Sequence, residues 1–178
     1  MARPRLTGVL LVGGASTRFG SPKALAQLNG ETLAERAWRT LGEACDERVA
    51  VGKKGDGLEL PFALADDGSD VRAPLAGIVA GLRAAPTDVA VMLPVDAPLV
   101  TPELLRALAE ACADAAVTHT GPLPAAFRKT ALPVLERRLG EHRLALHEAL
   151  AELGTRRIKV DEKLLANVNT PDELRRLG

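Results

Sequence analysis

A glycine-rich segment with two basic residues is the part of this sequence best suited to binding an anion. It spans residues 11–23 and reads Leu-Val-Gly-Gly-Ala-Ser-Thr-Arg-Phe-Gly-Ser-Pro-Lys. Gly13 and Gly14 let backbone N–H groups approach a phosphate without interference from a Cβ. Arg18 and Lys23 add positive charge, and a guanidinium can bind phosphate oxygens in a bidentate manner. The segment matches neither the Walker A nor the dinucleotide fingerprint, so it predicts another kind of phosphate loop; the alternative is a turn with two solvated cations.

Asp96 is the second residue whose surroundings suggest chemistry. It lies in the sequence Pro-Val-Asp-Ala-Pro at residues 94–98, directly after the apolar run 88–95. The flanking prolines fix φ and donate no hydrogen bond, so the carboxylate is held rigidly at the end of a strand. A single carboxylate of this kind suits Mg²⁺, which keeps most of its waters and completes its shell with phosphate oxygens. The alternative is a helix-capping aspartate, but Thr101 already supplies that cap.

Other polar residues give weaker indications. The three histidines have no metal-ligand spacing, and the two cysteines belong to no Cys-x-x-Cys pair. No side chain stands out as a nucleophile or a general base. Arg128 directly follows the expected strand at 124–127 and is a candidate to reach the phosphate of an acceptor substrate.

Apolar runs alternate with amphipathic segments along the chain, which predicts βαβ units on a mostly parallel sheet. The fold class is therefore α/β, a Rossmann-like three-layer sandwich, with residues 1–178 forming one domain. Loops after parallel strands share one edge of such a sheet, and ligands bind there. The expected strands are 6–12, 48–51, 62–65, 88–95, 115–118, 124–127 and 157–160; the expected helices are 32–44, 74–85, 101–113, 130–139, 145–153 and one beginning at the capping box of Thr170.

Composition excludes several classes of function. Hydrophobic residues make up 47% and charged residues 26%, as in ordinary globular proteins. Basic and acidic residues both number 23, so no net charge is available for non-specific binding to nucleic acid or an anionic membrane. Aromatic residues make up only 2%, too few for a base-stacking platform. The apolar run at 9–12 is too short for a signal peptide or a membrane span, which predicts a cytoplasmic protein.

Four motifs in a fixed order resemble the molybdenum cofactor guanylyltransferase family. They are the loop at 11–23, Ala-Pro-Leu-Ala-Gly-Ile at 73–78, the segment around Asp96, and Asn-Val-Asn-Thr-Pro at 167–171. Members of that family join the nucleotide of GTP to molybdopterin. The resemblance covers nearly the whole chain and implies a fold of the nucleotide-diphospho-sugar transferase type, dependence on Mg²⁺ and a cytoplasmic location.

The resemblance also implies roles for individual residues. Leu11, Val12, Gly13 and Gly14 would hold GTP, with Lys23 on its phosphates. Asp66, eleven residues before the glycine of Pro-Leu-Ala-Gly, would contact the nucleoside, or Asp67 would if the register slips by one residue. Asp96 would bind the metal and the nucleotide. Asn167 and Asn169 would close the site on the molybdopterin side. Because the charge of Arg18 in the loop would also offset that of the phosphates, we expect Arg18, Lys23 and Asp96 to be the catalytic residues.

The chain departs from the family pattern at three places. Gly-Lys-Lys at 52–54 stands where many members carry asparagine, Val12 replaces an alanine, and residues 121–124 offer few polar side chains for a pterin. The adjacent glycines Gly13 and Gly14 favour guanine, because cytidylyl relatives carry alanine at the first position. A transferase for CTP or another phosphate acceptor is the first alternative, and a non-catalytic nucleotide-binding module is the second. GTP and molybdopterin are the expected small-molecule partners, with transient contacts to proteins that deliver the pterin or receive the product, in a monomer or weak homo-oligomer.

Overall fold

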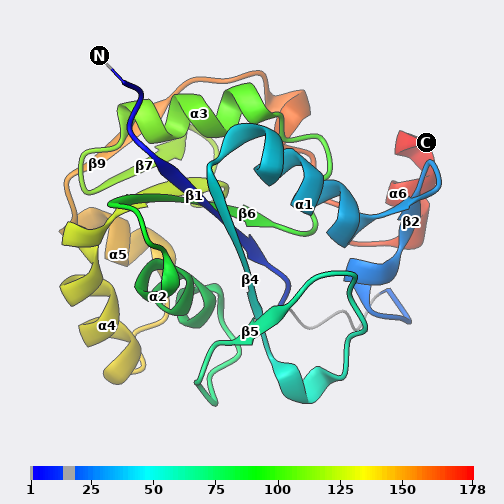
Figure 1. Ribbon diagram of the computed structural model, residues 1–178, viewed down its shortest axis with the longest axis horizontal. Coiled ribbons are helices and arrows are strands. Elements are labelled where there is room, and N and C mark those ends of the chain that lie inside the picture. The colour runs from blue at the N-terminus through cyan, green and yellow to red at the C-terminus, as the bar shows by residue number, and fades with distance from the viewer. Residues whose placement is uncertain (1, 14–18) are drawn as a thin grey trace.

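A seven-stranded sheet runs through the centre of the computed structural model, which describes residues 2–13 and 19–178 (Figure 1). The strand order is β5-β4-β1-β6-β8-β7-β9. Neighbouring strands pair in parallel except at β8, which is antiparallel to both β6 and β7. The strands are β1 (Leu6–Leu11), β4 (Glu47–Gly52), β5 (Leu64–Asp66), β6 (Val89–Pro94), β7 (Ala115–Thr118), β8 (Ala125–Arg128) and β9 (Thr155–Ile158).

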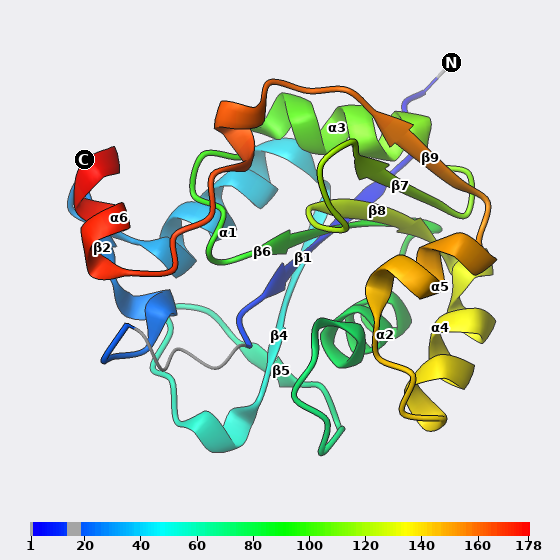
Figure 2. The same ribbon diagram turned by 180° about the vertical axis from the view of Figure 1, so that it is seen from behind.

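Helices cover both faces of the sheet, which confirms the predicted three-layer α/β architecture (Figures 1 and 2). One face packs against α1 and α3, and the other against α2, α4 and α5. Strand β1 shows how the sequence builds the two cores, because side chains alternate across a strand. Leu6 and Leu10 join the first core, whereas Val9 and Leu11 join the second. The helices are α1 (Leu33–Ala44), α2 (Pro74–Ala84), α3 (Pro102–Ala111), α4 (Leu132–Gly140), α5 (Leu146–Glu152) and α6 (Pro171–Leu177).

Local signals in the sequence account for where the helices begin. Thr32 caps α1 through a capping box with Glu35, and Thr101 caps α3 with its hydroxyl on the N–H of Leu104. Helix α2 lies close to β1: a Cβ built on Gly81 would be 2.4 Å from the Cγ1 of Val9. Glycine is therefore required there for the helix to approach the sheet.

The predicted elements are confirmed, with boundaries that shift by a few residues. The strand expected at 157–160 is observed as Thr155–Ile158, and the helix expected to reach residue 113 ends at Ala111. A small hairpin of β2 (Gln27–Leu28) and β3 (Glu31–Thr32) was not predicted. Four short 3₁₀ turns were not predicted either; they are η1 (Lys23–Leu25), η2 (Lys54–Asp56), η3 (Lys129–Ala131) and η4 (Glu162–Leu165).

The C-terminal segment returns across the molecule to the edge where β1 and β6 end. After β9 it passes α3, and α6 comes to lie beside β2 (Figure 2). The N–H of Val168 donates to the backbone oxygen of Asp96 over 2.8 Å, which ties this segment to the end of β6. Within the described part of the chain, no helix has the length and apolarity needed to cross a bilayer.

Candidate active site

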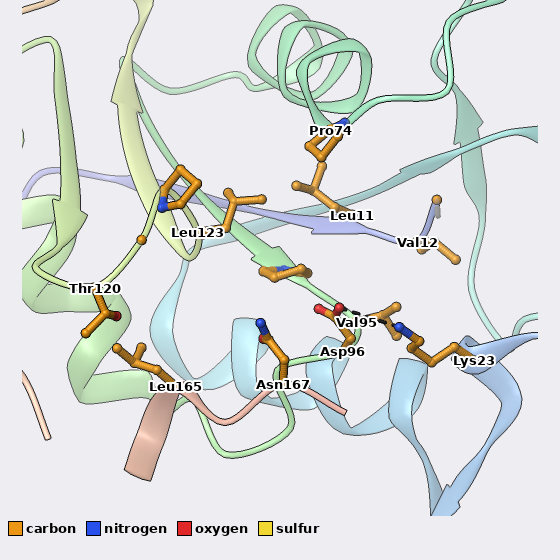
Figure 3. A pocket seen from close by; sticks show the side chains of 14 residues that line it. Leu11, Val12, Lys23, Pro74, Val95, Asp96, Thr120, Leu123, Leu165 and Asn167 are labelled. Atoms are coloured by element: carbon orange, nitrogen blue, oxygen red, sulfur yellow. Dashed lines mark ion pairs between the residues drawn. The ribbon is translucent and has the colours of Figure 1, made fainter. Parts of the chain in front are cut away.

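A cavity of 560 Å³ opens at the carboxyl ends of β1 and β6, the edge at which ligands bind in parallel sheets (Figure 3). Leu11, Val12 and Gly13 line it from the end of β1. Pro94 and Asp96 line it from the end of β6, and the two strands are direct neighbours. Parallel pairing thus brings the start of the glycine loop and the predicted metal carboxylate together.

Lys23 and Asp96 form an ion pair in this cavity (Figure 3). The Nζ of Lys23 lies 3.6 Å from the Oδ2 of Asp96 and 3.5 Å from the Oδ1 of Asn169. The two charged side chains are 16% and 28% exposed, so both are partly shielded but reachable from the cavity. Lys23 begins η1, which positions its side chain toward the end of β6. Among residues 2–13 and 19–178, Lys23 and Asp96 thus place a cation and a carboxylate next to the open space.

The C-terminal segment supplies the asparagines predicted for the acceptor side. Asn167 lines the cavity, and Asn169 contacts Lys23 from outside its lining. The capping box of α6 fixes the backbone at Asn169: the carboxylate of Glu173 accepts hydrogen bonds from the N–H groups of Asn169 and Thr170. Asn167 is next to Val168, whose N–H donates to the backbone oxygen of Asp96.

The wall opposite Lys23 comes from the loop between β7 and β8. Thr120, Gly121, Pro122 and Leu123 line the cavity there, together with Leu165 from η4 (Figure 3). Residues 121–124 lie where a contact with the pterin was expected, whereas Thr120, Leu165 and Pro74 had no predicted role. Their places in the sequence give only a weak indication of this: Thr120 follows β7, Pro74 begins α2, and Leu165 lies in the segment after β9.

A second cavity of 230 Å³ lies beside the first. The two share Leu11, Gly13 and Pro74, so they adjoin at the end of β1. The second cavity extends toward the ends of β4 and β5, where Lys53 and Asp67 line it. The site as a whole has a charged main chamber and a smaller side chamber.

Asp66, the acid favoured by its spacing, lines neither cavity. Its carboxylate accepts hydrogen bonds from the N–H groups of Lys54 at 2.9 Å and Gly68 at 2.8 Å. These backbone donors hold the pKa of Asp66 below its usual value. In this structure Asp66 stabilises a turn, and the next residue, Asp67, faces the side chamber.

Arg128 is far from the site, which corrects the expectation that it reaches an acceptor phosphate. It ends β8, and because β8 runs antiparallel to β6, its carboxyl end lies at the opposite edge of the sheet. Its guanidinium donates to the backbone oxygens of Ala113 and Cys112 and pairs with Asp88. Arg128 is therefore a structural residue. Gly14 and Arg18, the other loop residues predicted for the site, lie outside the described residues.

The side chains present fit a divalent metal whose shell is completed by substrate. Among residues 2–13 and 19–178, no three His, Cys, Asp or Glu side chains gather as a metal cluster. Asp96 offers one carboxylate on the cavity wall. Mg²⁺ needs no more than one or two carboxylates when phosphate oxygens and waters supply the other ligands.

Comparisons with known proteins agree with this geometry. The family model described as the MobA-like NTP transferase domain matches residues 8–158. This chain belongs to that family. A probable molybdenum cofactor guanylyltransferase of Chloroflexus aggregans is 34% identical over 96% of this chain and 92% of its own length. A molybdenum cofactor guanylyltransferase of Desulfosudis oleivorans is 32% identical over 95% of this chain and 92% of its own length.

A MobA-like transferase of known structure has the same fold. The crystal structure of molybdopterin-guanine dinucleotide biosynthesis protein A from Archaeoglobus fulgidus superposes with a TM-score of 0.82. The sequences are 28% identical, and the match covers 96% of each chain. As a member of the MobA-like family, this chain is a nucleotidyltransferase.

Proposed function

We propose that this protein transfers the GMP moiety of GTP to molybdopterin, forming molybdopterin guanine dinucleotide and releasing pyrophosphate. The observation that carries the proposal is the cavity at the ends of β1 and β6, with Lys23 and Asp96 on its wall. Its lining matches the motifs that resemble molybdenum cofactor guanylyltransferases, and curated relatives of that name align over nearly the whole chain. Residues 1–178 act as one catalytic domain in this proposal.

The reaction is an in-line displacement at the α-phosphorus of GTP. An oxygen of the terminal phosphate of molybdopterin attacks, the bond from the α-phosphorus to its bridging oxygen breaks, and pyrophosphate leaves. Such a step needs orientation and charge neutralisation more than a covalent nucleophile. The attacking phosphate is largely ionised near neutral pH, because its second pKa is about 6. No general base is then required.

The chain's own residues bind and orient the two substrates. The Lys23 ammonium, paired with Asp96 on the cavity wall, supplies positive charge for the phosphates of GTP and for the pyrophosphate that leaves. Asn167 and the 120–123 loop form the opposite wall, where molybdopterin binds. Asp96 would hold Mg²⁺, and the bound ion would supply charge neutralisation at the reacting phosphate. The protein works in the cytoplasm and has transient contacts with proteins that deliver the pterin or accept the product.

The decisive experiment is mass spectrometry of the product formed from molybdopterin, GTP and Mg²⁺. A mass equal to molybdopterin plus GMP, together with released pyrophosphate, is the expected result. The four nucleoside triphosphates are compared under equal conditions, and Asp96→Ala serves as the inactive control. Transfer from CTP with none from GTP would identify a cytidylyltransferase instead. Nucleotide binding without any transfer would indicate a non-catalytic module.

A further inference from the structure

The turn that carries Asp96 can donate few backbone hydrogen bonds. Prolines, which have no backbone N–H, stand at the end of β6, in the turn itself and at the start of α3; they are Pro94, Pro98 and Pro102. The apolar residues of the turn pack into the first core; they are Val95, Ala97 and Val100. Because apolar packing is not directional, the position of the Asp96 carboxylate depends on the hydrogen bonds that the turn accepts.

Two short hydrogen bonds hold this turn from distant parts of the chain. The N–H of Val168 donates to the backbone oxygen of Asp96 over 2.8 Å. The Nε of Arg36 donates to the backbone oxygen of Pro98, also over 2.8 Å. Hydrogen bonds within the turn are longer, at 3.3 and 3.4 Å. Pro98 is buried, so the loss of its charged donor would leave a shielded carbonyl without that partner.

Arg36 reaches Asp96 through the backbone and not through the cavity. It lies on α1, and its side chain is 26% exposed, so water competes only in part for its hydrogen bond. Within the described part of the chain, the residues that line the two cavities do not include Arg36. Any effect of Arg36 on a bound ligand must therefore pass through Pro98 and the two-residue step back to Asp96.

The outer end of the Arg36 guanidinium lies beside Glu31. One terminal nitrogen of Arg36 is 3.9 Å from the Oε2 of Glu31. Glu31 belongs to β3, which pairs with β2, and β2 begins two residues after the η1 turn that carries Lys23. Arg39, three residues further along α1, also binds Glu31, through two hydrogen bonds of 3.0 Å. The Arg36 guanidinium thus lies between the turn after Asp96 and the hairpin after Lys23.

We propose that Arg36 is a positioning residue for the metal site: its Nε–H group, donated to Pro98, fixes where the Asp96 carboxylate lies. The inference rests on the proposed function, in which Asp96 would hold the divalent metal. Mg²⁺ demands near-ideal octahedral geometry, so a small displacement of a carboxylate ligand weakens its binding. Residues that orient a metal ligand from outside its shell typically contribute about 10- to 100-fold to metal affinity or activity. Because Arg36 acts across two residues of backbone, we expect an effect at the lower end of that range.

Two substitutions of Arg36 differ at the atom that matters. In Arg36→Gln the side-chain nitrogen takes the place of the arginine Nε and can still donate to Pro98. In Arg36→Met a methyl group takes that place and donates nothing. Both substitutions remove the charge, and both residues are good helix formers. A difference between the two variants therefore reports the hydrogen bond to Pro98 and not the loss of charge from α1.

Arg39→Met is the matched control. Arg39 lies on the same helix and binds the same Glu31, but its hydrogen bonds go to Glu31 and Glu43 and not to the turn after Asp96. Its loss removes the same charge from α1. We expect Arg39→Met to keep the metal affinity and kcat of the wild type.

Binding of Mn²⁺ to the full chain tests the proposal without any transfer step. Mn²⁺ serves as a paramagnetic probe of the divalent site, and its affinity is measured by electron paramagnetic resonance in the presence of GTP and the absence of an acceptor. Arg36→Met should weaken Mn²⁺ binding about 10-fold, and Arg36→Gln should bind Mn²⁺ within about threefold of the wild type. In the transfer assay, excess Mg²⁺ should recover part of the rate lost in Arg36→Met and none of that lost in Asp96→Ala. Urea denaturation confirms that each variant is folded; if Arg36→Met is not, Arg36→Ala, which also lacks the donor, takes its place.

Three results would overturn the proposal. They are a folded Arg36→Met variant with the Mn²⁺ affinity of the wild type, an Arg36→Gln variant as impaired as Arg36→Met, and an Arg39→Met variant impaired to the same extent. Failure of the proposed function has a different signature. The expected order of Mn²⁺ affinities without transfer from GTP to molybdopterin would refute the transferase assignment and support the role of Arg36. Transfer with equal Mn²⁺ affinities in all three variants would do the reverse.

Discussion

Gly13→Ala separates the role of the glycine loop in ligand recognition from any role in folding. A Cβ built on Gly13 meets no described atom within 4 Å, and the residue does not lie in the left-handed region of backbone space. Alanine can therefore adopt the same backbone without a clash. Because alanine also restricts the unfolded chain, we expect the free energy of unfolding to change by between zero and a gain of about 1 kcal/mol.

The same methyl group should impair the choice of base. Gly13 lines both chambers, so an added Cβ enters space that a bound nucleotide would use. A purine displaced from the backbone leaves polar groups imperfectly paired, at a cost of about 1–3 kcal/mol. The preference for GTP over CTP, expressed as the ratio of their kcat/KM values, should then fall roughly 5- to 150-fold.

Gly81→Ala provides the matched control, because its methyl would collide with the core. The added Cβ would lie 2.4 Å from the Cγ1 of Val9, and overpacking of this kind costs about 1–3 kcal/mol of stability. Urea denaturation followed by the fluorescence of Trp38, the one tryptophan, measures both variants. Gly81→Ala should lose stability and keep its base preference. Equal use of CTP and GTP by the wild type, or a destabilised Gly13→Ala variant with its base preference intact, would contradict this role of Gly13.

Three further variants test the remaining assignments. Asp96→Ala should lower kcat more than about tenfold, which corresponds to an increase of the activation barrier above ~1.4 kcal/mol. The midpoint of urea denaturation should change little, and a smaller loss of kcat would show that Asp96 is not a catalytic residue. Lys23→Ala should lower kcat/KM for GTP, and an unchanged value would assign Lys23 to structure alone. The buried Arg138 forms ion pairs with Glu148 and Glu152 and holds the pKa values of both carboxyl groups below their usual range. These ion pairs therefore stabilise the fold at neutral pH, and that stabilisation is lost as pH falls through the lowered pKa values. Arg138→Met should therefore lower the free energy of unfolding at pH 7 and lower it much less near pH 3, as measured by urea denaturation at the two pH values, and an equal loss at both would contradict this.

The centre of the site could be predicted from the sequence because parallel strands impose a simple rule. An apolar run followed by glycines at residue 13 and another followed by Asp96 are strands whose carboxyl ends must share one edge. The structure pairs these strands directly, as Leu11 with Pro94. The contact of Lys23 with Asn169, 146 residues apart, has no such local signal, because it depends on where the C-terminal segment returns.

The true position of Arg128 could have been predicted from the length of the connection before its strand, although not from the composition of the strand. Its strand is apolar in either direction, so its residues alone do not show which way it runs. The connection does: only residues 119–124 separate β7 from β8. A parallel connection needs a crossover of a dozen or more residues, so this loop requires an antiparallel β8. Its last residue then lies at the edge opposite the site.

Spacing along the sequence alone does not decide whether Asp66 or Asp67 faces the cavity. Successive side chains in a strand point to opposite faces, so a shift of one residue changes which acid faces the cavity. Spacing from the Pro-Leu-Ala-Gly segment selects Asp66, but the backbone N–H groups of Lys54 in η2 and of Gly68 in the next turn occupy that carboxylate. Asp67 is instead held beside the chamber by Lys53, a residue at which the chain departs from the family pattern. The cation at position 53 and the acid at position 67 are therefore best understood as one unit.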